Sequence, residues 1–222
     1  MDKQKSVNNI IKARKEREKE YRINSIIQSA KKVFFKKGYL KATMEEIAQG
    51  AEITKPTIYQ YFKNKEDLFF SLMTPVIDDI GIQLGKIQKK LDEGEYKSGE
   101  AVLRAMFRAF YHSYEFSPET FRIIQIFQQT NLALELSSEF RKEINHKGRS
   151  NFELGRKILS DAMERGLINR ANTYTLADLI WGLTVGVIQL EDIKGDEQLG
   201  HRFKRSALNL AQEFFIKAMT AK

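Results

Sequence analysis

The spacing of apolar residues constrains this chain more than any other feature, because it is helical almost from one end to the other. From Ile23 onward, apolar residues recur three and four positions apart, which places them on one side of a helix. Strands would show alternating apolar and polar residues, or hairpin turns such as Asn-Gly and Asp-Gly, and the sequence has neither signal. We therefore predict an all-α protein of nine or so helices without a sheet.

Composition limits the functional classes. A chain of 222 residues is long enough for one or two domains with a buried core. The absence of cysteine excludes a disulfide framework, a cysteine-ligated metal site and a cysteine nucleophile. The N-terminus lacks an apolar segment of signal-peptide length, and the most apolar stretch, Leu176–Leu190, is short for a membrane span and contains Asp178. We expect a cytoplasmic protein with no membrane partner.

The positive charge is concentrated in the first third of the chain. The net charge is +8, and residues 1–72 contain 16 Lys and Arg against 9 Asp and Glu, a balance of +7. Residues 73–222 contain 21 against 20, a balance of +1. A basic end joined to a neutral remainder indicates a polyanion-binding module. A lysine-rich solvated surface would give the same balance, so charge alone leaves both interpretations open.

Residues 1–22 form a predicted basic helical arm. Opposite charges stand four residues apart, as in Arg14 and Glu18, and few residues could be buried, which favours a solvated helix. The alternative is that Lys12, Arg14 or Arg17 contact backbone phosphates or a minor groove.

Capping residues divide the next segment into short helices. Gly38 is placed to end the first core helix. Thr43, followed three residues later by Glu46, forms a capping box for a short helix. Thr54 can cap another short helix, which has Pro56 in its first turn.

A fourth helix is predicted to begin after Asn64 as cap, and we expect Pro75 to kink or break it. A shift of this helix about Pro75 is a predicted route from effector to DNA. Further helices are predicted at Glu100–Phe116, Pro118–Asn131, Leu136–Arg165 and Thr173–Asp192, with a last helix that ends near Thr220.

Two short helices joined by about three residues, within the basic third, are typical of a helix-turn-helix unit, whose second helix enters the DNA major groove. If Ile58 and Phe62 face the core, helical spacing turns the residues between and beside them outward. Glutamine can pair with adenine and lysine with guanine, while tyrosine hydroxyls can bind phosphates. The predicted outward face contains Pro56, Gln60 and Lys63, flanked by Lys55, Thr57 and Tyr59, with Tyr61 and Lys65 nearby.

The segment Gly38–Leu68 resembles the DNA-binding segment of the TetR family of bacterial transcriptional regulators. The motif that carries the resemblance is Thr43-Met44-x-x-Ile47-Ala48 followed by Thr57-Ile58-Tyr59-x-Tyr61-Phe62-x-Asn64-Lys65-Glu66. The resemblance implies that Thr43, Tyr59 and Lys65 hold phosphates, while positions 55–57 and 60–61 face bases. The DNA-binding residues that we predict are Thr43, Thr54, Lys55, Pro56, Thr57, Tyr59, Gln60, Tyr61, Lys63 and Lys65.

The turn departs from the family pattern at two positions. Glu52 stands where the family usually has glycine, and Gly50 where a small alanine is common. We predict that the turn keeps its shape with Glu52 at positive φ, at a strain of about 1–2 kcal/mol.

The resemblance also implies a C-terminal helical domain that dimerises and binds a small effector. The helix Thr173–Asp192 is apolar on almost every side, and Gly182 and Gly186 would let another helix approach closely. With the last helix it predicts a four-helix bundle in a homodimer, which would bind a double-stranded DNA operator with two half-sites. Burial of both helices within one chain is the alternative.

The effector site is predicted from aromatic residues interleaved with polar ones, as in ligand pockets. A large, mostly apolar effector is expected, and Arg104, Arg108 and Arg122 would admit an anionic one such as an acyl thioester. The same pattern describes a helical core with wet edges. The predicted effector-binding residues are Phe107, Tyr111, His112, Gln125, Gln128, Asn151 and Trp181.

Catalytic and metal-binding signatures are weak. Gly81–Ile87 is similar to a phosphate-binding loop in its letters only, because the spacing is one residue short and no strand precedes it. Glu143 and His146 could share a metal on one helix face, but di-metal bundles need that motif twice. The carboxylates of Asp78 and Asp79 are predicted to be solvated. We expect no enzyme, no metal and no cofactor.

The sequence thus predicts a DNA-binding transcriptional regulator, a repressor that a small effector releases from its operator. The predicted domains are the arm at 1–22, the helix-turn-helix domain at 23–68 and the regulatory domain at 69–222. The alternative function is a non-catalytic α-helical interaction or membrane-surface module that uses the basic arm. The arm lacks a large apolar stripe, which weighs against a membrane surface.

Overall fold

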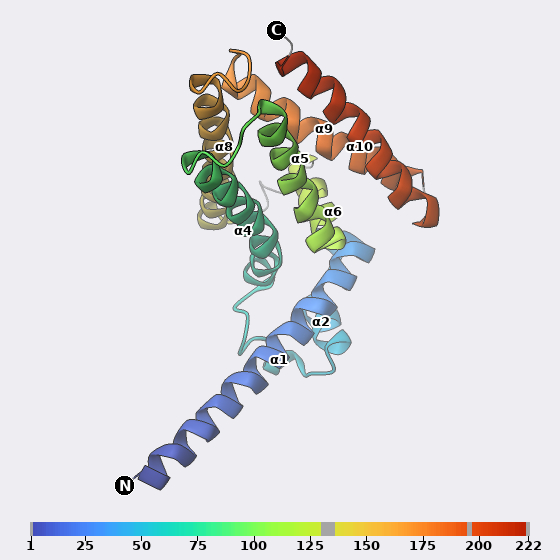
Figure 1. Cartoon of the computed structure of the whole chain (residues 1–222). Coiled ribbons are helices and arrows are strands. Elements are labelled where there is room, and N and C mark those ends of the chain that lie inside the picture. Colours follow the sequence, from blue (N-terminus) through green and yellow to red (C-terminus); the bar gives the residue numbers. More distant parts are fainter. Residues whose placement is uncertain (1, 130–135, 195–196, 221–222) are drawn as a thin grey trace. The chain divides into compact units, whose positions relative to one another are not determined.

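The computed structural model describes residues 2–129, 136–194 and 197–220, with side chains described within 9–126, 136–192, 194 and 206–220. Throughout these residues the fold is helical and contains no strand, which confirms the predicted class (Figure 1). The helices are α1 (Asp2–Lys41), α2 (Met44–Gly50), α3 (Lys55–Ile58), α4 (Lys65–Asp92), α5 (Gly99–Phe116), α6 (Pro118–Gln129), α8 (Ser138–Glu164), α9 (Thr173–Ile193) and α10 (Glu197–Thr220).

The predicted arm and the first core helix together form α1. Its N-terminal part extends beyond α2 and α3 (Figure 1), and the side chains of residues 9–21 are all exposed. Gly38 has φ 73 and ψ 165, a conformation that glycine adopts without steric cost, and it kinks the helix where we predicted its end. Helical hydrogen bonding resumes directly after the kink, where Ala42 N donates to Gly38 O at 3.2 Å.

The chain divides into two compact units. The first contains Met1–Pro75 and Glu119–Lys142, and the second contains Val76–Pro118 and Glu143–Lys222. The division falls inside α4, directly after Pro75. The helix continues through this proline, so the predicted break is absent. A proline removes only one backbone hydrogen bond, and the rest of the helix retains its own.

The core of the first unit is built around three aromatic rings. The Phe69 ring of α4 lies 5.3 Å from the Phe34 ring and 4.7 Å from the Tyr39 ring, centre to centre. Ile26 of α1 and Ile47 of α2 are fully buried in the same unit. These contacts join the end of α1 to the start of α4 and leave α2 and α3 at the surface of the unit.

The core of the second unit is centred on α5, whose apolar side is buried along most of its length. Phe107 packs edge to face against Phe215 of α10, with ring centres 5.6 Å apart. At the start of α5, Gly99 lies so close to Leu167 that any side chain would strike the Leu167 carbonyl oxygen. The glycine therefore permits this close approach.

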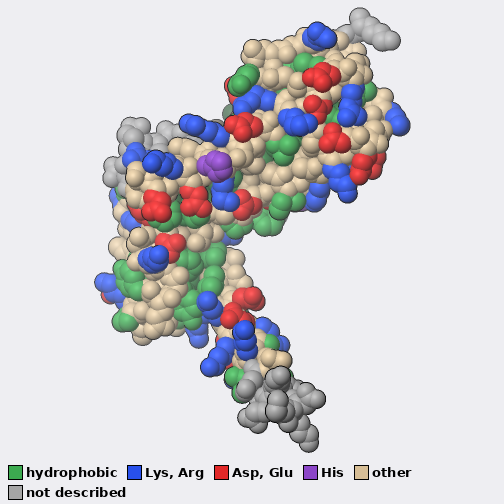
Figure 2. All heavy atoms as spheres, turned by 90° about the vertical axis from the view of Figure 1, so that its left-hand side faces the viewer, with side chains coloured by type: hydrophobic (Ala, Val, Ile, Leu, Met, Phe, Trp, Pro, Cys, Tyr) green, Lys and Arg blue, Asp and Glu red, His purple; other side chains and the backbone are tan. Residues whose placement is uncertain are grey.

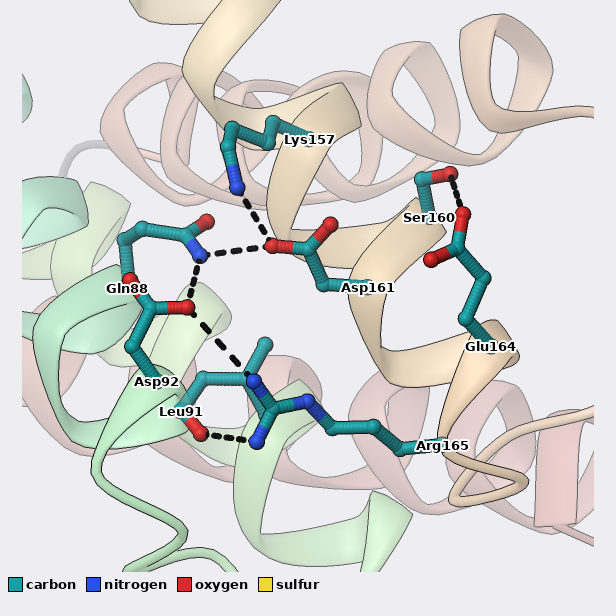
Figure 3. A network of polar contacts seen from close by, with 8 residues as sticks. All are labelled: Gln88, Leu91, Asp92, Lys157, Ser160, Asp161, Glu164 and Arg165. Atoms are coloured by element: carbon teal, nitrogen blue, oxygen red, sulfur yellow. Dashed lines mark hydrogen bonds and ion pairs between the residues drawn. The ribbon is translucent and has the colours of Figure 1, made fainter.

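A polar network joins the C-terminal part of α4 to α8 (Figure 3). Asp161 accepts hydrogen bonds from Lys157 Nζ at 2.6 Å and Gln88 Nε2 at 2.7 Å, and Arg165 donates to the carbonyl oxygen of Leu91. Burial raises the pKa of Asp161, but the bonds from Lys157 and Gln88 outweigh it and lower the pKa below its ordinary value. The ionised carboxylate thus holds the two helices together.

By length and hydropathy alone, α4 and α9 could each cross a membrane, whereas we expected the apolar stretch Leu176–Leu190 of α9 to be too short for one. Core helices of soluble proteins pass the same test. In α4, buried Asp79 and Gln88 interrupt the apolar surface.

Candidate DNA-binding surface

The helix α2 begins with the predicted capping box. Thr43 Oγ1 accepts from Glu46 N at 3.2 Å, and the Glu46 carboxylate accepts from Thr43 N at 3.2 Å. Lys37 of α1 donates to the same carboxylate, and this hydrogen bond is the main reason why the pKa of Glu46 is lowered. Thr43 is exposed, and its hydroxyl hydrogen can still be donated to a phosphate.

The helix α3 ends before Phe62, although our prediction used helical spacing from Ile58 to Phe62. It ends at Ile58, and turns follow at Tyr59–Tyr61. Thr54 caps it as expected, because its Oγ1 accepts from Thr57 N at 3.4 Å and lies 2.8 Å from Thr57 Oγ1. One α-type hydrogen bond continues beyond it, from Phe62 N to Ile58 O at 3.0 Å. The direction of the later side chains therefore depends on the turns as well as on helical spacing.

Two apolar side chains hold this element from behind. Ile58 is 0% exposed and Phe62 is 5% exposed, as their predicted inward direction requires. Tyr59 is 46% exposed. Of the predicted DNA-binding residues, the structure exposes Thr43, Thr54, Lys55, Pro56, Tyr59, Gln60 and Lys63, and it half-buries Thr57, Tyr61 and Lys65.

Lys55 has an intramolecular partner on this surface. Its Nζ lies 3.3 Å from Glu45 Oε2 of α2, and both side chains are more than half exposed. Exposed pairs of this kind contribute little, typically less than about 1 kcal/mol, so the ammonium can exchange Glu45 for a phosphate.

The turn between α2 and α3 keeps the predicted conformation. Glu52 has φ 56, and it is the one non-glycine residue with positive φ in the described part of the chain. Glu52 N donates to Gln49 O at 3.1 Å, and Ile53 N donates to Ala48 O at 3.0 Å. These bonds hold Glu52 in the left-handed region despite its side chain.

Ser29 accounts for the glycine at position 50. Ser29 Oγ donates to Ile47 O at 2.7 Å, and a Cβ on Gly50 would lie 2.4 Å from this Oγ. Ser29 was not among the predicted residues, although a serine between the buried Ile26 and Ala30 is a signal that its hydroxyl has a hydrogen-bond partner.

Lys65 differs most from what the resemblance implies. Its Nζ donates to the carbonyl oxygens of Tyr39 at 2.8 Å, Leu40 at 3.3 Å and Ala42 at 3.1 Å. It also lies 4.5 Å from the centre of the Tyr39 ring. Burial lowers the pKa of Lys65. The ammonium is occupied by the end of α1 instead of facing outward.

Among the predicted effector residues, Trp181 lies in an aromatic cluster of the second unit. Its ring lies 5.3 Å from Phe110 of α5 and 6.5 Å from Phe152 of α8, both edge to face. Phe107 is fully buried in the core.

The remaining aromatic and amide positions are distributed over both units. Tyr111 packs against Tyr114 of the same helix, with ring centres 5.7 Å apart. Gln125 is buried but belongs to the first unit. The side chain of Gln128 lies outside the described residues.

Asp79 is buried, and our prediction that it is solvated is wrong. It is 9% exposed, and its carboxylate accepts from His112 Nδ1 at 2.9 Å, Ser113 Oγ at 3.1 Å and Gln83 Nε2 at 3.0 Å. Burial raises the pKa of Asp79, but these hydrogen bonds outweigh it and lower the pKa below its ordinary value. A carboxylate on the apolar side of a helix is the signal that could have shown this.

Asn151, another predicted effector residue, is directed toward α4. Its Nδ2 donates to Ile77 O at 2.8 Å, and a Cβ on Gly81 would lie 2.7 Å from its Oδ1. This places Asn151 in a contact between helices of the second unit.

The weak catalytic signals have structural explanations. Gly81–Ile87 lies inside α4, where backbone N–H groups are used within the helix. No group of three or more metal-ligating side chains occurs in the described part of the chain.

A short exposed element, anchored from behind and joined to a capped helix through a tight turn, defines a helix-turn-helix protein with a helical C-terminal region. Residues 26–72 match the family model of bacterial regulatory proteins, tetR family. This match covers the helix-turn-helix segment, and the described chain has the TetR-type fold.

Related proteins agree with this assignment. The chain is 26% identical over 200 residues to the uncharacterized HTH-type transcriptional regulator YhgD of Bacillus subtilis (strain 168), covering 88% of this chain and 95% of the relative. The transcriptional regulator FadR from Bacillus subtilis in complex with stearoyl-CoA has a TM-score of 0.61, with 22% identity over 84% of this chain and 96% of the other. AibR in complex with isovaleryl coenzyme A and operator DNA has a TM-score of 0.63, with 21% identity over 85% and 97%.

Proposed function

We propose that this protein is a cytoplasmic repressor that binds a specific operator as a homodimer and is released by a small, largely apolar effector. The observation that supports DNA recognition is the segment from Thr54 to Lys63, where polar side chains are exposed while Ile58 and Phe62 anchor the backbone. We propose functional domains at 1–22, 23–68 and 69–222, whereas the compact units of the structure divide after Pro75 and include Glu119–Lys142 in the first unit.

Selection from a random duplex pool tests sequence recognition. The full chain should enrich a two-part operator, and Gln60→Ala should reduce discrimination at one base position by about 1–3 kcal/mol, because a bidentate pair with adenine is lost. Gln49→Ala, an exposed glutamine of α2, is the matched control and should leave the preference unchanged. A pool without enrichment, or equal effects of the two substitutions, would reject this assignment.

Exposed apolar surface on α9 and α10 supports a homodimer. Leu179 is 47% exposed and Phe214 is 67% exposed. A Cβ on Gly182 or Gly186 would meet nothing within 4 Å, so room remains for another helix to approach. We infer that these helices pack against their counterparts in a second copy.

Sedimentation measurements test the dimer. Leu179→Glu and Phe214→Glu should each shift the protein toward monomer, because the charge would have to be buried without a partner. Ile82→Glu is the control, since Ile82 is also exposed but lies on α4. A dimer that survives both interface substitutions would contradict the proposed arrangement.

The effector site is proposed at the aromatic cluster around Trp181. Exposed Arg108 on α5 could pair with an anionic group. Two similar structures are described as complexes with stearoyl-CoA and isovaleryl coenzyme A, which supports an acyl thioester as effector class.

The one tryptophan of the chain gives a direct measurement. Long-chain acyl-CoA should change Trp181 fluorescence and release the operator at the same concentration, whereas coenzyme A alone should do neither. A reporter placed behind the operator should be repressed without effector. Activation of the reporter, or release by coenzyme A alone, would refute the respective part of the proposal.

A further inference from the structure

In the exposed arm of α1, four basic residues lie on one side of the helix. At 100° per residue, Lys12, Lys15, Lys19 and Arg22 fall within about 80° of one another, and we call them the basic row. Ile26, which is buried in the core, lies on the same side of α1 as the basic row. The acidic residues of the arm lie outside the row.

The basic row has no partner within the described part of the chain. None of its four cations makes an ion pair there, while Arg14, outside the row, is bound to Glu18 at 2.7 Å. Figure 2 shows Lys and Arg side chains gathered along the described portion of the arm. A helix that packs against nothing is only marginally stable, so the basic row is not explained by folding.

The arm and the helix-turn-helix belong to the same compact unit. Ser29 of α1 binds Ile47 of α2, and Lys37 of α1 binds Glu46 of α2. The helix α2 therefore packs on the same side of α1 as the basic row. The basic row, from Lys12 to Arg22, spans about 15 Å at 1.5 Å per residue. Duplex DNA carries one phosphate charge per about 1.7 Å of its axis, so a surface of this length faces many phosphates.

We propose that the basic row is a second phosphate-binding surface, which contacts duplex DNA beside the bases read by the helix-turn-helix. The inference rests on the proposed function and adds sequence-independent affinity to it. A membrane surface is disfavoured, because Ile10 and Ile11 are the only aliphatic side chains larger than alanine between residues 9 and 22 and make no apolar stripe.

The test replaces all four residues by glutamine, which preserves helix propensity. If each cation neutralises one phosphate, the slope of log affinity against log salt should decrease in magnitude by about 3.6 for each arm in contact. A fourfold rise in salt concentration would then reduce the DNA affinity of the variant about 150-fold less, for each arm in contact, than that of the wild type. The preferred sequence should not change, and hydroxyl-radical protection should be lost only at the flanks of the operator.

The matched control removes four exposed lysines from the second unit, in the variant Lys86→Gln, Lys89→Gln, Lys90→Gln and Lys97→Gln. It has the same net charge as the arm variant and should retain the wild-type slope.

Equal slopes for arm variant and wild type, or an equal loss in the control, would overturn the inference while operator binding by the wild type still stands. Loss of binding to anionic vesicles with an unchanged DNA slope would also overturn it, in favour of a lipid surface. Failure of the wild type to select any operator would instead refute the proposed function.

Discussion

Lys65 Nζ lies 2.8 Å from the carbonyl oxygen of Tyr39 and 4.5 Å from the centre of the same residue's ring. The first helical residue of α4 thus closes the end of α1, where carbonyl groups lack helical partners and attract cations. We therefore propose that Lys65 stabilises the fold of the helix-turn-helix and that Lys55 and Lys63 are its phosphate-binding lysines. Without the arm, two subunits would then release four counterions, for a salt slope of about −3.6.

Lys65→Met should therefore act on stability. We expect it to lower the free energy of unfolding by about 1.5–3 kcal/mol, the usual value of hydrogen bonds to a charged group, and to leave the salt slope of DNA binding unchanged. Lys63→Met, at an exposed position nearby, should leave stability unchanged and reduce the magnitude of the slope by about 0.9 per subunit. Denaturant titration and binding at 50 and 200 mM salt distinguish the two, and the reverse pattern would return Lys65 to the DNA.

Gly50 and Ser29 should be energetically coupled. Gly50→Ala alone should lower the free energy of unfolding by about 1 kcal/mol, because the new Cβ displaces Ser29 Oγ from Ile47 O. In a Ser29→Ala background the same substitution should raise it by up to about 1 kcal/mol, since alanine favours helix more than glycine does. Chemical denaturation of the four proteins measures the cycle, and the same sign in both backgrounds would contradict the contact.

The features that could be predicted from the sequence depend on local interactions. The caps at Thr43, Thr54 and Asn64 use hydrogen bonds that span three residues, so the spacing of residue types was sufficient. The positive φ of Glu52 followed from the position of the turn within the motif.

Interactions between distant segments could not be derived in this way. Lys65 binds carbonyl groups more than 20 residues away, and Asp79 binds Ser113 of another helix. Both depend on which helix faces which, and the spacing of residue types along one sequence does not reveal helix packing. The length of α3 was also missed, because the turns after Ile58 retain enough helical bonds to resemble a longer helix in sequence.

The strain at Glu52 can be measured by comparing two substitutions. Glu52→Gly and Glu52→Ala remove the same carboxylate, but only glycine adopts the left-handed region without steric cost. We expect the glycine variant to be more stable than the alanine variant by about 1 kcal/mol, after allowance for the greater freedom of glycine in the unfolded chain. Thermal unfolding would check this, and an alanine variant of equal or higher stability would show that the turn relaxes.

Asp79 should make stability depend on pH in the acid range. Its pKa in the folded state is lower than in the unfolded chain, so the ionised group contributes stability that is fully present above an unfolded pKa of about 3.9 and is lost as pH falls through the lower folded value. The free energy of unfolding of the wild type should therefore fall more steeply below about pH 4 than that of Asp79→Asn, which should already be lower by about 1–3 kcal/mol at pH 7. Asp78→Asn is the matched neighbour, because Asp78 pairs with Lys147 at an exposed position and should change stability by less than about 1 kcal/mol. Urea titrations of the three proteins between pH 3 and 7 measure the difference, and parallel curves for wild type and Asp79→Asn would mean that the buried carboxylate is not preferentially ionised in the folded state.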